Sequence, residues 1–91
     1  MDRYRIPDDL MLQVVRDEAV ILDPASGRYY TLNEVGTRMI QLYREHGSLE
    51  AVIAGIVAEY AVEPADARAD LEQLLSDMAA NGLAKPVDPQ A

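Results

Sequence analysis

Apolar residues in the first third of the chain follow strand patterns. Two apolar and partly β-branched runs, 10–15 and 19–22, are separated by polar residues 16–18, which suit a turn. The segment 23–27 contains aspartate, proline, serine and glycine and indicates a second turn. The aromatic and β-branched segment 28–32 then predicts a third strand. Three consecutive strands joined by short turns are most simply arranged as an antiparallel meander.

After this segment the apolar spacing becomes helical. Asn33 is a natural N-cap for a first helix, and Gly47 indicates where that helix ends. Ser48 caps a second helix, and Pro64 suits the first position of a third. The Asn-Gly-Leu sequence at 81–83 is typical of a Schellman cap. The expected helical segments are therefore 33–47, 48–60 and 64–81.

Three strands followed by three helices predict an α+β fold. The helices are expected to cover one face of a small three-stranded antiparallel sheet, in the outline of a winged helix. The 91 residues suffice for one domain with a single core. Because both ends contain prolines, we expect loosely held tails at 1–9 and 85–91 and a folded domain at 10–84.

The charge balance excludes some classes of partner. The chain has 16 acidic and 8 basic side chains, which gives a net charge of -8. A field of this sign repels nucleic acid phosphates and anionic lipids, so neither nucleic acid nor a membrane is an expected partner. No apolar run is long enough to cross a bilayer, and the first residues lack the apolar region of a signal peptide. A cytoplasmic location is expected.

The sequence offers no recognisable catalytic or metal-binding set. It contains no cysteine, and its one histidine, His46, stands at the end of an expected helix, where an imidazole stabilises the carbonyl groups. We find no nucleophile with a base, no paired carboxylates in a pocket and no glycine-rich phosphate loop. The expectation is a protein without catalytic residues, metal or cofactor, and therefore not an enzyme.

The third expected strand is the most informative local feature. Alternation places Tyr30 and Leu32 on one face, which we expect to be the core face, and Tyr29 and Thr31 on the other. Arg28 is the only charge on this strand, so its edge is poorly protected against pairing with another strand. Such an edge can accept an extended peptide. Alternatively, the tyrosines only favour strand formation, and a helix or a second copy covers the edge.

The third expected helix carries a broad apolar stripe. Most such stripes only form core, but this one is wide enough to serve a groove as well. Helix geometry brings Arg68, Leu71, Glu72 and Leu75 within one to two turns of each other. Arg68 lies near the start of the helix, where a cation is mildly unfavourable, which points to an acidic ligand group or to a neighbouring carboxylate such as Asp70 or Glu72. The stripe consists of Ala67, Leu71, Leu74, Leu75 and Met78.

Several of these segments together resemble the PqqD-like family, the small proteins also called RiPP recognition elements. The match extends over roughly 10–84, and its most distinctive part is the sequence Gly-Arg-Tyr-Tyr-Thr-Leu-Asn at 27–33 together with the C-terminal Gly-Leu. The segments that carry the resemblance are Val20-Ile21-Leu22-Asp23, the run from Ser26 to Thr37, Asp70-Leu71, Leu74-Leu75 and Asn81-Gly82-Leu83.

This resemblance implies a function and a site. Family members bind the leader part of a ribosomally made precursor peptide and present its core to a separate modifying enzyme. The leader adds as a strand to the third strand and lies against the third helix. By position, the resemblance implies a strand edge formed by Arg28, Tyr29, Tyr30 and Thr31 and a groove wall formed by Arg68, Leu71, Leu74 and Leu75.

One departure bears on the pathway. Family members of the quinone pathway tend to carry a tryptophan and a proline at the third strand, whereas this chain has no tryptophan. It is more similar to the stand-alone members found in lasso-peptide and other peptide-modification clusters. The pathway, the precursor and the enzyme served are not assigned by the sequence. An open strand edge is compatible with a monomer or a weak homodimer.

Two other functions stay open at this point. A winged-helix DNA-binding regulator requires a basic face, but the third helix carries Asp66, Asp70, Glu72 and Asp77 against one arginine. An adaptor that binds a folded partner protein would use the apolar helix face and would not need an open strand edge. Selective binding of an extended peptide separates the favoured function from this last one.

Overall fold

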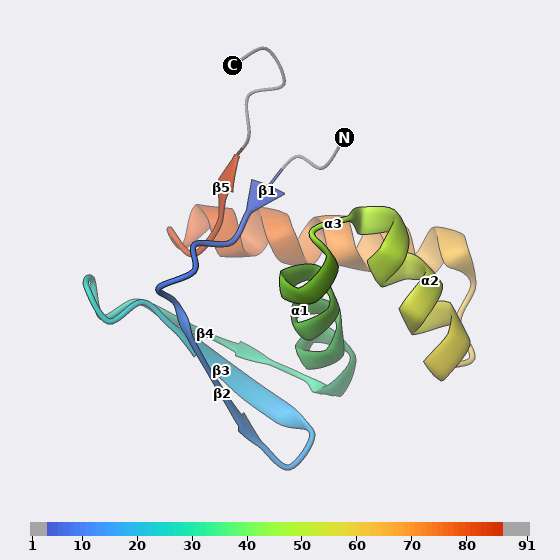
Figure 1. Ribbon diagram of the computed structural model, residues 1–91, viewed down its shortest axis with the longest axis horizontal. Coiled ribbons are helices and arrows are strands. Elements are labelled where there is room, and N and C mark those ends of the chain that lie inside the picture. Colours follow the sequence, from blue (N-terminus) through green and yellow to red (C-terminus); the bar gives the residue numbers. More distant parts are fainter. Residues whose placement is uncertain (1–3, 87–91) are drawn as a thin grey trace.

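Three antiparallel strands are followed by three helices in the computed structural model, which describes residues 4–86 (Figure 1). Two very short strands at the chain ends form a separate small sheet within this range. The predicted α+β class, with a three-stranded antiparallel sheet before three helices, is confirmed. The elements are β1 (Tyr4–Arg5), β2 (Met11–Val15), β3 (Glu18–Leu22), β4 (Tyr29–Leu32), α1 (Glu34–His46), α2 (Leu49–Glu59), α3 (Pro64–Ala80) and β5 (Lys85–Pro86).

The main sheet is the expected meander, with β3 between β2 and β4. The register aligns Leu12, Ile21 and Tyr30 across the three strands and places Ala19 beside Leu32. Because side chains alternate, these residues share the face that is turned to the helices. Ile21 is completely buried there, and Leu32 is nearly so.

The helix ends match the signals in the sequence. The Asn33 side chain caps α1 by accepting a hydrogen bond from the Gly36 N–H at 2.8 Å. After α3, the Leu83 N–H donates to the Met78 carbonyl at 2.8 Å, and Gly82 has a φ of 77°, as a Schellman cap requires. Within residues 4–86, none of the helices has the length and hydrophobicity to cross a membrane.

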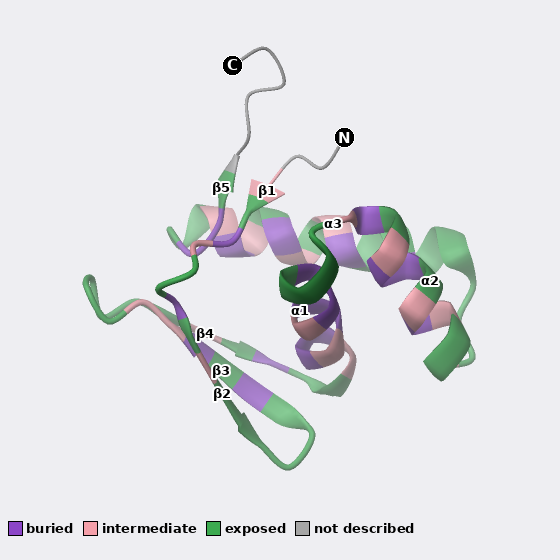
Figure 2. Ribbon diagram, in the orientation of Figure 1, coloured by how far each residue is buried: buried purple, intermediate pink, exposed green. Residues whose placement is uncertain are grey.

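The core lies between the inner face of the sheet and the three helices. Figure 2 shows buried residues on the sides of the helices that face one another and along β3 and β4. Helix α3 contributes Leu71, Leu75 and Met78, each with at most 1% of its surface exposed. Burial of such side chains contributes roughly 1.5–3 kcal/mol each to folding, so α3 is a structural element of the core as well as a candidate site element.

The chain ends differ from the sequence-based expectation. Loosely held tails are expected at 1–9 and 85–91, but Tyr4–Arg5 pairs antiparallel with Lys85–Pro86, and Ile6 is part of the core. Strands of two residues are too short to show a period of two, and their partners come from opposite ends of the chain. No local pattern therefore predicts this pairing. The outermost residues of both expected tails lie outside the described part.

Candidate functional site

Strand β4 has one unpaired edge in the part of the chain that the structure describes. It is the outer strand of its sheet and pairs with β3 alone. The Asp23 N–H donates to the Arg28 carbonyl at 2.8 Å, and hydrogen-bonded pairs alternate along an antiparallel ladder. Tyr30 and Leu32 therefore bond to β3, whereas the backbone N–H and C=O groups of Tyr29 and Thr31 point to the open edge. This edge can form backbone hydrogen bonds with an added strand.

A groove separates this strand from α3. It has a volume of about 330 Å³, and one wall comes from α3 while the other comes from β4 and the start of α1. Leu74 is half-buried on the α3 wall, and Met39 of α1 is almost fully buried beneath it. The lining residues are Tyr30, Asn33, Val35, Gly36, Met39, Asp70, Gln73, Leu74 and Asp77.

Polar groups connect the two walls at one point. The Tyr30 hydroxyl donates to Asp77 Oδ2 at 3.5 Å, and Gln73 Nε2 donates to Asp77 Oδ1 at 2.9 Å. Burial and the neighbouring Asp77 carboxylate raise the pKa of Tyr30 above its ordinary value, so the phenol stays a neutral donor at physiological pH. The two side chains that donate hydrogen bonds to Asp77 are thus both neutral, and they leave the negative charge of its carboxylate uncompensated in the groove.

Arg28 links the start of β4 to the end of α3. Its Nη1 donates to the Asn81 carbonyl at 3.5 Å, and a cation is favourable at the carbonyl end of a helix. Together with the contact between Tyr30 and Asp77, this fixes the direction of the groove. The strand runs antiparallel to α3, with Arg28 near Asn81 and Tyr30 near Asp77.

The four strand residues expected in the site lie along this edge. Tyr29 is 63% exposed and shares the outer face of the sheet with Thr31, while Tyr30 points inward and lines the groove. The inward orientation of Tyr30 is the one expected from the alternation with Leu32. Arg28 precedes the strand, and its side chain reaches the end of α3 without lining the groove.

Only one of the three leucines expected in the groove wall lines the groove. Leu74 does so, but Leu71 and Leu75 are 0% and 1% exposed and belong to the core. The correction follows from the rotation of α3 about its axis. Residues 71, 75 and 78 face the core, whereas residues 70, 74 and 77, one position earlier in each turn, face the groove. Both sets have the same spacing of four and three residues, so the sequence pattern alone does not show which set faces the core.

Arg68 is also placed away from the groove. Its guanidinium forms an ion pair with Glu50 of α2, and this hydrogen bond raises the pKa of Arg68. The partner is therefore a carboxylate from another helix and not Asp70 of its own helix. Arg68 is not among the residues that line the groove.

We expect Arg68→Ala to leave peptide affinity within about twofold of the wild type. The reason is that its ion pair is exposed, and exposed pairs contribute little to stability and nothing to a site that they do not touch. Titration of a labelled peptide against both proteins measures the effect. A tenfold loss of affinity with an unchanged melting temperature would return Arg68 to the site.

The groove is also lined by residues that the resemblance did not place in the groove wall. Asp70, Gln73 and Asp77 of α3 line the groove together with Met39 of α1. The signal for Asp70 and Asp77 is their spacing relative to Leu74, since residues four before and three after it share its helix face, and Gln73 lies three after Asp70 and four before Asp77. Met39 comes from a helix distant in sequence, and only the fold brings it there.

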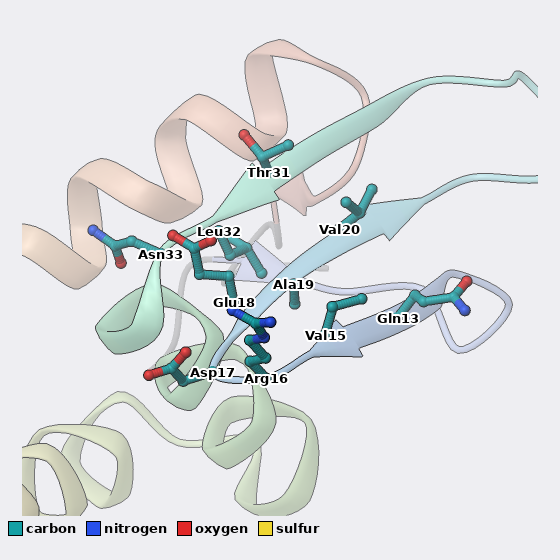
Figure 3. A pocket seen from close by; sticks show the side chains of 10 residues that line it. All are labelled: Gln13, Val15, Arg16, Asp17, Glu18, Ala19, Val20, Thr31, Leu32 and Asn33. Carbon is teal, nitrogen blue, oxygen red and sulfur yellow. The ribbon is translucent and has the colours of Figure 1, made fainter.

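A larger hollow, of about 920 Å³, lies at the other side of the sheet. Figure 3 shows Gln13, Val20 and Thr31 side by side on the outer face, beside the turn formed by Arg16 and Asp17. None of the residues that line this hollow comes from a helix, so no helix stands opposite a strand edge there. The smaller groove, which lies beside an unpaired strand edge and has apolar and charged side chains in its wall, is therefore the better candidate for binding an extended peptide.

Comparison with known proteins agrees with this geometry. Residues 18–84 match the family described as Coenzyme PQQ synthesis protein D (PqqD). The chain belongs to the PqqD family. This match covers β3, β4 and all three helices, and so includes both walls of the groove. A search of curated proteins gives no match.

Two solved structures share the fold of this PqqD family member. One is TbiB1 in complex with the TbiA(beta) leader peptide, with 31% identity, a TM-score of 0.79 and coverage of 88% of this chain and 93% of that chain. The other is lasso peptide synthetase B1 complexed with the leader peptide, with 28% identity, a TM-score of 0.79 and coverage of 93% and 100%. Both of these similar proteins were solved with a leader peptide.

Proposed function

We propose that this chain is a RiPP recognition element that binds the leader of a ribosomally synthesised precursor peptide. The leader adds as a strand to the open edge of β4 and lies in the groove against α3. The protein then presents the precursor to a separate modifying enzyme and performs no chemistry itself. The observation that carries the proposal is the unpaired β4 edge opposite the α3 wall.

The groove has the properties that this binding mode needs. Tyr29 and Thr31 provide backbone donors and acceptors at the edge, which supply affinity independent of sequence. Leu74 provides an apolar surface for an inward-facing side chain, and the almost fully buried Met39 also lines the groove. Membership of the PqqD family and the likeness to two proteins solved with leader peptides support the same assignment.

The other two functions have less support. The charges that α3 presents to the groove are Asp70 and Asp77, and the one arginine of this helix pairs with Glu50. A helix of this charge is unsuited to DNA phosphates. An adaptor would use the apolar stripe of α3, but Leu71 and Leu75 of this stripe are buried in the core and are not accessible to a partner. The open strand edge therefore favours an extended peptide.

The proposal is tested with peptides selected from a display library of random 20-residue sequences. The strongest binder is titrated into isotope-labelled protein, and backbone amide shifts are followed. We expect the shifts to concentrate on 29–33 and on 70–77, with little change in α2, because these two segments line the groove, together with residues 35–39 of α1, and α2 does not. Shifts centred on α2, or a failure of the library to yield any binder, would overturn the assignment.

A further inference from the structure

The groove wall on α3 has a regular pattern of charge. Asp70 and Asp77 flank Leu74 at spacings of four and three residues, so all three share one helix face. None of the described residues that line the groove is a lysine or an arginine. The α3 wall therefore presents an acidic, an apolar and an acidic position in succession.

The nearby cations are engaged elsewhere. Arg28 donates to the Asn81 carbonyl at the end of α3, and Arg68 pairs with Glu50. Among the described residues, neither Asp70 nor Asp77 forms an ion pair, and Asp77 accepts only from the neutral groups of Tyr30 and Gln73. The two carboxylates thus enter the groove without a compensating charge, on a chain whose net charge is -8.

The three positions along α3 are spaced somewhat more closely than same-face residues of a strand. A helix rises about 1.5 Å per residue, so Leu74 lies about 6 Å along the axis from Asp70 and about 4.5 Å from Asp77. In a strand, residues two apart are about 6.6 Å from each other and point to the same face. Because β4 runs alongside α3, a strand added to β4 does so too.

From this geometry we propose that the groove selects leaders in which an inward-facing apolar residue is flanked, two positions away on each side, by lysine or arginine. The apolar side chain packs on Leu74, and the basic side chains reach Asp70 and Asp77. This inference rests on the proposed function and specifies the peptide that the same site takes. An acidic residue at the flanking positions is repelled by the groove and by the net charge of the protein.

The exposure of the groove sets the size of the effect. Asp70 is exposed and Asp77 half-buried, so each pair is partly screened by solvent and by salt. We expect the two pairs together to change affinity by about tenfold at low salt and by less at 0.5 M salt. Shape and backbone hydrogen bonds still determine where the peptide binds.

A charge exchange tests the inference with the same random 20-residue library. The wild type is expected to enrich peptides with lysine or arginine two positions from an apolar residue. The double variant Asp70→Lys/Asp77→Lys is expected to enrich aspartate or glutamate there, and to bind the wild-type-selected peptide about tenfold more weakly. Replacing the basic residues of that peptide by glutamate should restore binding to the variant.

The matched control is Asp8→Lys/Asp9→Lys, which makes the same change in net charge on exposed residues outside the groove. It should select the same peptides as the wild type. Should the lysine variant of the groove fail to fold, Asp70→Asn/Asp77→Asn is used, and it should lose the basic preference.

The outcomes separate this inference from the proposed function. Equal weakening by the groove variant and its control, or no basic enrichment among peptides that shift the β4 amides, overturns the charge selection alone. If selected peptides do not shift the β4 amides at all, the proposed function itself is wrong.

Discussion

Leu75→Ala is expected to lower the free energy of unfolding by about 2–5 kcal/mol, because it removes a buried side chain and leaves a cavity in the core. Leu75 is 1% exposed and lies between the core residues Leu71 and Met78 on α3. For a domain of this size, such a loss lowers the melting temperature by roughly 10 °C or more. Urea denaturation and thermal melting of the two proteins measure it.

Leu74→Ala is the matched control, since it removes the same atoms from the next residue of the same helix. Leu74 is half-buried and lines the groove, so its truncation should weaken peptide binding and change stability less than Leu75→Ala does. If Leu75→Ala instead weakened binding while the melting temperature stayed unchanged, Leu75 would belong to the groove and the assignment of the α3 faces would be wrong.

Thr31→Pro is expected to weaken binding of the library-selected peptide by about tenfold or more while the fold persists. The Thr31 N–H points to the open edge of β4, so proline removes a donor for the added strand and leaves the bonds to β3 intact. The unpaired carbonyl of the peptide alone costs about 1–3 kcal/mol, which at 1.4 kcal/mol per factor of ten accounts for the expected loss. Fluorescence anisotropy with the labelled peptide gives the dissociation constants.

Val14→Pro on β2 provides the corresponding control. By the same alternation, the Val14 N–H points to the open edge of β2, on the opposite side of the sheet. It should bind the peptide like the wild type. Equal losses in the two proline variants would indicate a general disturbance of the sheet, and an unchanged affinity in Thr31→Pro would exclude strand addition at β4.

The order and type of the main elements could be predicted from the sequence because their signals are local. The two apolar runs joined by the polar residues around Asp17 form the hairpin of β2 and β3. Asn33 caps α1, Pro64 starts α3, and Gly82 ends it with a positive φ. Each of these signals depends on residues within a few positions of one another, which is the range that a sequence pattern describes.

The composition of the groove could be predicted only in part. Leu71 and Leu74 are both members of one broad apolar stripe, and the rotation of α3, which buries the first and exposes the second, is set by packing against α1 and α2. The pairing of Arg68 with Glu50 likewise depends on how α2 and α3 cross. The tyrosine edge was found because strand alternation and the resemblance both pointed to it, and Tyr30 indeed lines the groove.

The contacts that fix β4 in place determine how the loss of conformational entropy on binding is divided between the protein and the peptide. Asn33 caps α1 directly after the strand, Tyr30 contacts Asp77, and Arg28 contacts the Asn81 carbonyl, so both walls of the groove are held before a peptide arrives. A flexible peptide loses about 1–2 kcal/mol of conformational entropy per ordered backbone residue, whereas the groove loses little. Under the proposed function, the shortest leader segment that fills the groove is therefore expected to be the most efficient ligand.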